Sequence, residues 1–499
     1  MNPPSLPVLI AGAGPSGLVL AIELARRGIP LRIVEQRDSP LGASRGKGIQ
    51  PRTLEVFDKM ELVSAVMAAG APYPAQCIHT AAGETLRQDF ERRPPSPSEP
   101  YGQPWMVVQW KTERVLRDHL ATLGHRVEWG TRLESFQQDE SCVKATLLSI
   151  AGGENVDASY LVGCDGGRST VRSLLDIPFP GKTMGVRAVV ADIRITGLDR
   201  DAWHRFNDGD MGRQLGLCPL MGTDLFQLQA PVPFDTDIDV SAAALGRMIL
   251  ERTGVADIAV ADVSWASVFE MNARLADRYR AERVFLVGDA AHVHPPTGGQ
   301  GLNTSIQDAF NLGWKLAAVS AGAPDSLLDT YEHERRPIAV DVLGLSIRFL
   351  QAATKGEMRR GREAQQLDIG YVDSPLALEA PSRTAGLRAG ARAPDASLTR
   401  ASGEVVRLFD LVRGPHWTLL CLGGSDAPHA RGDMHVHCIG RGCEFSELDD
   451  AFRDSYGARD GDWFLIRPDG YVGAILGADE HALLDGYMAP MRAGRLTKS

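Results

Sequence analysis

The chain lacks the features that several protein classes require. None of its stretches approaches the roughly 20 uninterrupted apolar residues of a membrane span. Its N-terminus has no basic region followed by a long apolar one, so we expect no signal peptide and a cytoplasmic protein. Lys and Arg number 53 against 63 Asp and Glu, a net charge of −10. This balance argues against a general nucleic-acid binder, which needs a basic face.

Cysteine is scarce and irregularly spaced. The seven cysteines form no Cys-x-x-Cys pair, which predicts reduced, mostly buried and inert thiols. Cys438 and Cys443 lie near His435 and His437, but their spacing matches no standard zinc pattern. We therefore predict no metal site.

The residues that are present point first to a glycine-rich turn near the N-terminus. Residues 6–11 are apolar and predict a buried strand, and residues 15–28 predict a helix that ends at Gly28. Between them stands Gly12-Ala13-Gly14-Pro15-Ser16-Gly17. Its three glycines allow the backbone to approach a pyrophosphate, and the helix N-terminus adds amide donors.

Residues 31–35 predict the next parallel strand, which completes a βαβ unit. This strand ends in Glu35, followed by Gln36. Glu35 stands close to the expected spacing of about 20 residues for an acid that binds a ribose hydroxyl. The combination predicts a dinucleotide site.

A second glycine-rich turn appears late in the chain. Residues 284–287 are apolar and precede Gly288-Asp289-Ala290-Ala291-His292. The loop then runs through Pro295, Gly298 and Gly301 to a predicted helix that starts near Leu302 and Asn303. Two such turns in one chain predict a large cofactor held at both ends, and FAD fits that description. His292 and His294 could be catalytic, but a turn histidine bonded to backbone carbonyls is at least as good an interpretation.

A third motif, Cys164-Asp165-Gly166-Gly167-Arg168, follows a strand-like run at 160–163. Asp165 could accept from a ribose hydroxyl or could cap the following helix. The capping interpretation would prevail for this motif alone. Together with the other two motifs, it favours a cofactor contact.

The remaining pattern predicts three regions. Helices are expected at 51–70, 111–123, 243–253, 303–320 and 326–350, and strands at 126–129, 143–150, 185–195 and 213–231. The Ala-, Gly-, Arg- and Pro-rich stretch 384–394 predicts a linker. Beyond it, strands are expected at 417–422 and at 462–472, the latter with a hairpin turn at Pro468-Asp469-Gly470.

The three motifs, in this order and spacing, resemble those of the class A FAD-dependent aromatic hydroxylases, the p-hydroxybenzoate hydroxylase family. The resemblance covers about residues 6–350. It implies that Asp165 contacts FAD and the nicotinamide cofactor and that Asp289 binds the ribityl chain. It further implies that Arg45, in Ser44-Arg45-Gly46, lies beside the pyrophosphate, and that Gln109 contacts FAD.

The resemblance also implies an α/β fold with three parts. A Rossmann-like FAD-binding domain would comprise residues 1–75, 100–180 and 280–390. A β-sheet substrate domain would comprise 76–99 and 181–279, and a small thioredoxin-like domain 391–499. The C-terminal part is similar to that of the longer phenol and polyketide hydroxylase branch, but without Cys-x-x-Cys a redox role for it is not expected.

The implied activity is a monooxygenase that uses NAD(P)H and O2 to hydroxylate a phenolic or polycyclic aromatic compound through a flavin C4a-hydroperoxide. The flavin would carry the chemistry, with Arg45 and Pro295 as candidate catalytic residues and no metal. The protein is expected to be a monomer or homodimer that binds neither nucleic acid nor membrane. The complete set of expected cofactor contacts is Gly12, Gly14, Pro15, Ser16, Gly17, Glu35, Gln36, Arg45, Gln109, Asp165, Asp289, Gly298, Gly301, Leu302 and Asn303.

Other functions remain open at this point. A Baeyer–Villiger or epoxidising monooxygenase could use the same scaffold, and so could a catalytically idle flavin-binding protein. A flavin halogenase ranks last because its W-x-W-x-I signature is absent. Seven residues of the middle sheet could line a substrate pocket, although each could equally be ordinary core: Trp203, Phe206, Leu215, Leu217, Pro219, Phe226 and Leu228.

Overall fold

The first glycine-rich turn and its flanking strands belong to a six-stranded sheet in the computed structural model, which describes residues 6–88, 90, 93–380, 386–423, 428–430 and 433–492. The order is β18 (Arg280–Ala281), β19 (Val284–Leu286), β12 (Tyr160–Gly163), β1 (Val8–Ala11), β2 (Leu31–Glu35) and β8 (Glu128–Trp129). All pairings are parallel except that of β18 with β19. Strands from three distant parts of the chain thus meet side by side, and each of the three motifs follows one of them.

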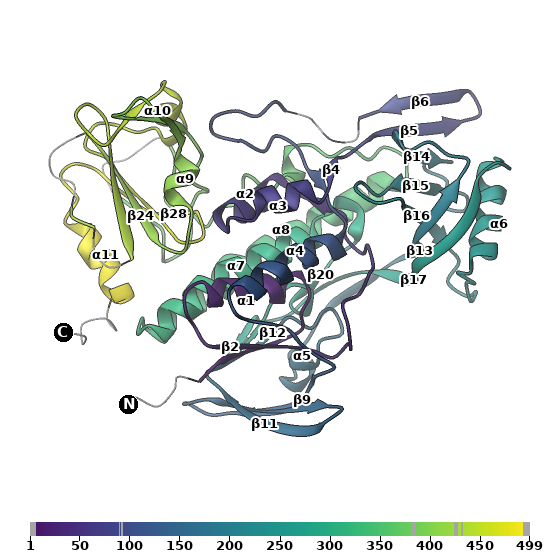
Figure 1. Ribbon diagram of the computed structural model, residues 1–499, viewed down its shortest axis with the longest axis horizontal. Helices are drawn as coiled ribbons and strands as arrows, with labels where there is room; N and C mark the ends of the chain where they lie inside the picture. Colours follow the sequence, from purple (N-terminus) through teal and green to yellow (C-terminus); the bar gives the residue numbers. More distant parts are fainter. Residues whose placement is uncertain are drawn as a thin grey trace.

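Helices cover this sheet because its strands are apolar on both faces. α1 (Pro15–Ala25) packs against α7 (Gly301–Ser320) and α4 (Gln109–Thr122), and α8 (Asp329–Ala353) lies beside α7 (Figure 1). Within the described residues, none of the helices combines the length and apolarity needed to cross a bilayer.

The predicted helix at 51–70 is divided into α2 (Pro51–Lys59) and α3 (Val63–Ala68). The break falls at Glu61, whose φ of 64° is a left-handed conformation that no helix continues through. A small sheet of β3 (Gly48–Ile49), β7 (Trp105–Met106) and β4 (Ala71–Pro72) connects these helices to the rest. Another is built from β9 (Arg132–Gln138), β10 (Val143–Ser149) and β11 (Gly152–Ala158), and a short helix, α5 (Thr170–Leu174), follows β12.

The middle region forms a separate eight-stranded sheet. Its order is β20 (His292–Val293), β17 (Ala259–Leu275), β13 (Gly181–Thr196), β16 (Phe226–Val232), β15 (Leu215–Pro219), β14 (Ala202–Phe206), β5 (Ala75–Thr80) and β6 (Gly83–Arg87). The helix α6 (Ala242–Thr253) covers one face, where Leu245 and Ile249 complete an apolar core with the strands. Two segments that lie far apart in sequence, 75–87 and 202–206, become neighbours in this sheet.

The C-terminal region forms a third sheet of eight strands. Its order is β21 (Leu378–Glu379), β28 (Val472–Leu476), β27 (Trp463–Ile466), β24 (Trp417–Leu422), β25 (Met434–Ile439), β26 (Phe445–Glu447), β22 (Ser397–Arg400) and β23 (Val405–Arg407). The helices α9 (Leu408–Val412), α10 (Ala451–Tyr456) and α11 (Leu483–Arg492) accompany it. The predicted hairpin turn at 468–470 is confirmed, since β27 and β28 pair antiparallel across it.

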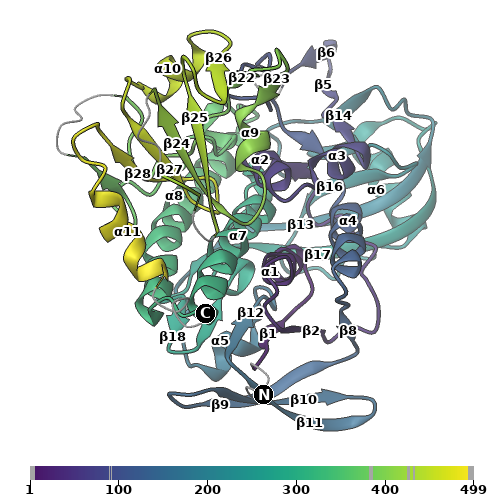
Figure 2. The same cartoon turned by 60° about the vertical axis from the view of Figure 1, so that its left-hand side comes forward.

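A fully buried ionic cluster joins this third sheet to the helices of the first. Arg467, after β27, donates to both oxygens of Glu334 in α8 at 2.7 and 2.9 Å. Glu334 also pairs with Lys315 of α7 at 2.7 Å, and Asp469 accepts from Trp314 at 3.0 Å. Figure 2 shows the C-terminal sheet lying against α7 and α8. These charges are stable without water because each one is paired.

The predicted linker at 384–394 is wrong for its described part. Residues 384 and 385 lie outside the described residues, but Ala389 and Ala393 are buried in the core of the third sheet. Arg392 is also buried and donates to Glu55 of α2 at 2.9 Å. The glycine and alanine content therefore reflects close packing instead of a loose spacer.

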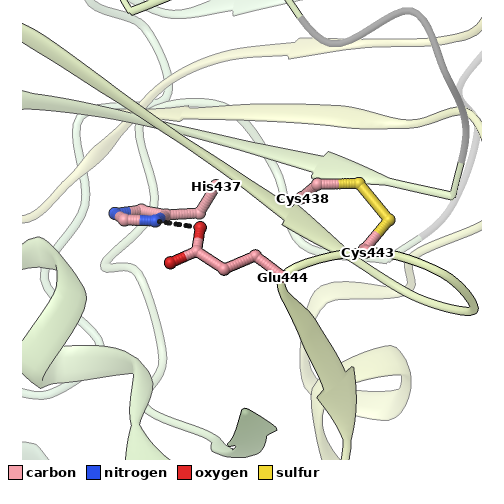
Figure 3. Close-up of a disulfide and its surroundings, with 4 residues drawn as sticks. All are labelled: His437, Cys438, Cys443 and Glu444. Atoms are coloured by element: carbon pink, nitrogen blue, oxygen red, sulfur yellow. Dashed lines mark hydrogen bonds and ion pairs between the residues drawn. A yellow bond between two sulfur atoms is a disulfide. The ribbon is translucent and has the colours of Figure 1, made fainter. Parts of the chain in front are cut away.

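The expectation of seven reduced cysteines is also corrected. Cys438 of β25 and Cys443 are joined in a disulfide, beside an ion pair of His437 with Glu444 (Figure 3). The other five are free and buried, at positions 77, 142, 164, 218 and 421. A spacing of five residues gave no signal for this bond, because the turn between β25 and β26 is what brings the two sulfurs together.

Candidate functional site

The first glycine-rich turn leaves open space at only one of its three glycines. An added Cβ at Gly12 would lie 2.4 Å from the Cys164 carbonyl oxygen, and one at Gly17 would lie 2.0 Å from the Gly12 oxygen. At Gly14, none of the described residues beyond the two chain neighbours has an atom within 4 Å of the added Cβ. Gly12 and Gly17 are therefore required for backbone packing, whereas Gly14 borders a hollow at the N-terminus of α1, which begins with Pro15 and Ser16. The unpaired amides of such a helix end attract an anion.

Glu35 closes the far side of this turn. Its carboxylate accepts from the Ala13 amide at 3.0 Å and from the Arg37 amide at 3.2 Å, and it is almost fully buried. Gln36 is exposed. The Glu35 side chain therefore fixes the shape of the turn, in addition to any contact with a ribose.

Asp165 caps the following helix with one carboxylate oxygen and leaves the other oxygen for a further partner. One oxygen, Oδ2, accepts from the Thr170 and Val171 amides at 2.7 and 3.1 Å and so caps α5. The other, Oδ1, is buried and makes no hydrogen bond to any of the described residues. Leaving a buried carboxylate oxygen without a partner is costly, so this atom marks a place where a hydroxyl group of a ligand would bind.

The second glycine-rich turn lies directly against the first. Gly288 has a φ of 64°, and an added Cβ there would lie 2.8 Å from Ser305 and 3.3 Å from the Ser16 hydroxyl. Asp289 is exposed to a hollow beside it. The surrounding protein replaces much of the water there, and this loss of solvation raises the pKa of Asp289. The charges of His292 and Arg45 act in the opposite direction but are the smaller effect.

Side chains in the loop after this turn are mostly engaged with protein. Pro295 is buried, and a Cβ at Gly298 would meet the Phe349 ring of α8 at 2.9 Å. A Cβ at Gly301 would meet the His294 ring at 3.1 Å. A side chain at position 298 would therefore point toward α8, so a contact of Gly298 with FAD would have to come from its backbone.

Leu302 and Asn303 begin α7 on the opposite side of the hollow. The Leu302 side chain would lie 3.4 Å from a Cβ at Gly46. Asn303 accepts from the Gln50 amide at 2.8 Å and donates to the Gly48 oxygen at 2.9 Å. Its side chain is thus occupied in joining α7 to β3, which leaves the backbone of α7 as the part that faces a ligand.

Arg45 extends from a loop that is fixed at both sides. The Ser44 amide donates to Asp192 of β13 at 2.8 Å, and the Gly46 amide donates to Gln109 at 3.0 Å. Gln109 in turn donates to Glu113 at 2.9 Å. Arg45 itself is exposed. A loop that is fixed at both sides therefore presents an exposed cation whose charge acts on Asp289, and Gln109 holds the loop in place.

The two histidines of the second turn have structural partners. His292 is fully buried and shares a 2.7 Å hydrogen bond with Asp308 of α7. Burial and the neighbouring His292 lower the pKa of His294 to about 4, so His294 is neutral at physiological pH. These contacts favour the interpretation of both as turn residues.

Sequence reasoning missed two residues that hold these loops, Asp192 and Asp308. Both are fully buried carboxylates. A detectable signal existed, since Asp192 interrupts the apolar run 188–193 and Asp308 lies on the buried face of α7. Nothing in the sequence, however, indicates that Asp192 reaches residue 44.

A cavity of about 550 Å³ lies where the motifs meet the middle sheet. Asp289, His294 and Pro296 line one side, Gly167 and Arg168 a second, and Phe269, Met271 and Arg274 of β17 the third. Its volume is in the range of small-molecule sites. A larger hollow of about 920 Å³ lies along α8 and includes Arg280, Glu332 and His333, but none of the residues of the three motifs. We therefore assign the site to the smaller cavity.

The apolar residues proposed for a substrate pocket are mainly core. Five of them pack in the cluster between the middle sheet and α6: Phe206, Leu215, Leu217, Phe226 and Leu228. Pro219 is buried in β15. Trp203 instead packs with Met106 and Cys218, and the Lys47 ammonium lies 4.3 Å from its ring centroid.

These features fit FAD in a specific way. The hollow at Gly14 at a helix N-terminus suits a pyrophosphate, and the unpaired Asp165 Oδ1 suits a hydroxyl donor. Asp289, in the cavity, suits the polyol that leads to the flavin ring. The three follow the carboxyl ends of the neighbouring strands β1, β12 and β19, where an extended cofactor would bind.

Comparison with known proteins agrees with this geometry. Residues 5–346 match the FAD binding domain family. A flavin-dependent monooxygenase of Mycobacteroides abscessus is 40% identical over 94% of this chain and 96% of its own. The 6-methylpretetramide 4-monooxygenase of Streptomyces rimosus is 33% identical over 94% and 90%.

A solved structure extends the similarity to the whole fold. The ternary complex of aklavinone-11 hydroxylase with FAD and aklavinone superposes with a TM-score of 0.82 at 28% identity, covering 99% of both chains. The likeness includes the C-terminal sheet, which the family match at 5–346 does not reach.

Proposed function

The chain belongs to the FAD-binding family of flavin-dependent aromatic monooxygenases, and from this premise we propose that it hydroxylates a polycyclic phenol in the cavity beside Asp289. The reaction would consume NAD(P)H, a proton and O2, and release NAD(P)⁺, water and a product with one added hydroxyl group. Bound FAD supplies the redox chemistry, accepting a hydride and activating dioxygen. The protein must bind both molecules, orient them and exclude water.

The cavity itself is the observation that carries this proposal. Its apolar wall, with Phe179, Phe269 and Met271, suits a flat ring system, and its three arginines suit phenolic oxygens. Arg172 is held in place, since it donates to the Ala290 oxygen at 2.8 Å and lies 3.9 Å above the Phe179 ring. Arg274 makes only long contacts, of 3.4 and 3.5 Å, and is the arginine best able to turn toward a ligand.

Two relatives support a polycyclic substrate over a single ring. One acts on 6-methylpretetramide and the other was solved with aklavinone, by their names.

For this function we retain the division into three domains that the sequence predicts. An FAD-binding unit would comprise 1–75, 100–180 and 280–390, a substrate sheet 76–99 and 181–279, and a third unit 391–499. The third sheet also includes β21 (Leu378–Glu379), which pairs with β28, so the third unit would have to begin before 391.

Product analysis under ¹⁸O2 tests this function. The yellow holoprotein is mixed with NADPH or NADH and with anthraquinone- or naphthacene-type phenols, and NAD(P)H loss is followed with and without each compound. We expect stimulation by a phenol and a product that carries one ¹⁸O atom as a ring hydroxyl. Ring expansion to a lactone would establish the Baeyer–Villiger alternative, and an epoxide the epoxidising one. If none of the compounds stimulated NAD(P)H loss, the result would instead favour a catalytically idle flavin-binding protein.

A further inference from the structure

Cys77, His79 and His204 meet at one edge of the middle sheet, far from every motif discussed above. Their ligand atoms all lie within 4.8 Å of one another. The pairing of strands produces this meeting. Cys77 and His79 are two residues apart on β5 and so share a face, and β14 runs parallel to β5 with His204 opposite Cys77. In Figure 1, the hairpin of β5 and β6 lies along the edge of the molecule, next to β14.

The hydrogen-bond partners determine which ring nitrogens carry hydrogen. His204 Nε2 lies 3.2 Å from the carbonyl oxygen of Asp199, which can only accept. His204 must therefore donate from Nε2 and present a lone pair at Nδ1. His79 Nδ1 lies 3.2 Å from the Glu84 carboxylate. With this carboxylate as the acceptor, His79 donates from Nδ1 and presents its lone pair at Nε2.

These two lone pairs point at each other. His79 Nε2 and His204 Nδ1 are 3.0 Å apart. Two acceptors at that distance repel unless a cation lies between them. Tetrahedral zinc, with bonds of about 2.0–2.1 Å to nitrogen, holds neighbouring nitrogens about 3.3 Å apart, which needs only a small opening of this pair.

We propose that Cys77 Sγ, His79 Nε2 and His204 Nδ1 bind one Zn²⁺ ion, with Glu84 and the Asp199 carbonyl orienting the two imidazoles. A thiolate and two imidazoles favour zinc over magnesium or calcium, which prefer oxygen. An acceptor on the second nitrogen of each ligating histidine is the usual arrangement of such sites. Glu84 supports His79 from a side chain that is 69% exposed, so water has access to this side of the site and would complete the tetrahedron.

The surroundings suit a structural ion. Cys77 and His204 are almost fully buried, 5% and 2% exposed, and the His79 ring stacks on Phe206 at 4.1 Å. The β5–β6 hairpin is the edge of its sheet and is held by a single neighbouring strand. A zinc ion bridging β5 and β14 would fasten this edge.

Zinc binding by the full-length, untagged holoprotein tests the proposal. The protein is cleared of metal with a chelator, titrated with Zn²⁺ against a chromophoric chelator, and its metal content is measured after dialysis. We expect one zinc per chain, no binding of Mg²⁺, and a zinc-dependent rise in melting temperature. Cys77→Ser and His204→Gln should lose binding altogether.

A milder variant guards against misfolding. Glu84→Gln changes an exposed side chain and should weaken zinc binding about 10- to 100-fold, the effect of losing a supporting carboxylate. Two matched controls should bind as the parent does, Glu134→Gln on an exposed strand and Cys421→Ser at a buried thiol. Full zinc binding in the Cys77 and His204 variants would overturn the assignment. A parent protein that binds no zinc would overturn the assignment as well, and would indicate that the rings of His79 and His204 share a proton instead.

Discussion

Asp308 of α7 accepts a hydrogen bond from Arg335 of α8 at 2.7 Å, and both side chains are fully buried. The same carboxylate accepts from the Gly288 amide at 3.3 Å and bonds to His292 at 2.7 Å. Burial alone would raise the pKa of Asp308, but the charges of Arg335 and His292 hold it below its ordinary value. One ionised carboxylate thus fixes the turn that presents Asp289.

Asp308→Asn should therefore both destabilise the protein and weaken FAD binding. The buried Arg335 would lose its counter-charge, a change that costs about 3–5 kcal/mol. Thermal unfolding and FAD retention during gel filtration measure the two effects. Asp262→Asn, at an exposed ion pair with Arg194, serves as the control and should change little. An Asp308→Asn protein with parental stability would show that the pair does not hold the turn.

Gly14→Val should abolish FAD binding and leave the apoprotein folded. The added side chain would enter the hollow at the helix N-terminus, where, apart from the two chain neighbours, none of the described residues has an atom within 4 Å of the new Cβ. Fluorescence titration with FAD and far-UV circular dichroism separate the two properties. Gly486→Val, at another open glycine in α11, is the matched control. Full FAD binding by Gly14→Val would place the pyrophosphate elsewhere.

Asp289→Ala should raise the FAD dissociation constant about 10- to 150-fold. Loss of a hydrogen bond to a charged group costs about 1.5–3 kcal/mol, and 1.4 kcal/mol is tenfold. The fold should persist because the Asp289 side chain is exposed. Equilibrium dialysis gives the constant, with Glu282→Ala as the control. An unchanged constant would contradict the ribityl contact.

Arg45→Ala should slow flavin reduction by NAD(P)H and largely retain FAD. The loop stays fixed through Ser44 and Gly46, so only the exposed guanidinium is lost. Its positive charge would attract the phosphates of the nicotinamide cofactor. Stopped-flow reduction under anaerobic conditions measures the rate, with Arg132→Ala as the control. Equal rates for Arg45→Ala and the parent would make Arg45 a solvated loop charge.

Lys59 should make stability depend on pH in the alkaline range. Burial, with the charges of Arg26 and Arg27, lowers its pKa to about 7, against 10.5 ordinarily. Between these values the unfolded lysine binds a proton that the folded one does not. Stability therefore rises with pH, by at most about 1.4 kcal/mol per unit. The contribution is complete above about pH 10.5 and is lost as pH falls toward 7.

Lys59→Met removes this titration. The melting temperature of the parent, relative to that of Lys59→Met, should rise as pH increases from about 7 to about 10. Lys144→Met, at an exposed lysine of β10, should follow the parent at every pH. A constant difference between the parent and Lys59→Met would show that Lys59 keeps its proton in the fold.

Sequence patterns predicted the parts of this structure that depend on local signals. The turn at 12–17, the strands at 160–163 and 284–287, and the hairpin at 468–470 all follow from residues that stand next to one another. FAD was predictable for the same reason, because its motifs each follow a buried strand. The break in α2–α3 was not, since Glu61 is not a residue that usually adopts a positive φ.

Long-range contacts were beyond such reasoning. The direction of Gly298 toward Phe349 depends on where α8 lies, and the bond from Ser44 to Asp192 depends on the pairing of two domains. The meeting of Cys77 with His204 depends on β5 joining β14, whose residues stand more than a hundred positions away. In each case the fold determines which residue is the partner, and the spacing of residues along the chain does not indicate it.

The ionic cluster of Arg467, Glu334 and Lys315 has a consequence for building hybrid enzymes. A C-terminal unit taken from a relative would bring its own residue to position 467. If that residue were neutral, Glu334 would keep only Lys315 as a counter-charge. Segments 311–334 and 463–472 must therefore be exchanged together. The buried charges of the third sheet complement those of α7 and α8. A chimera that exchanges the third sheet alone would therefore fold poorly.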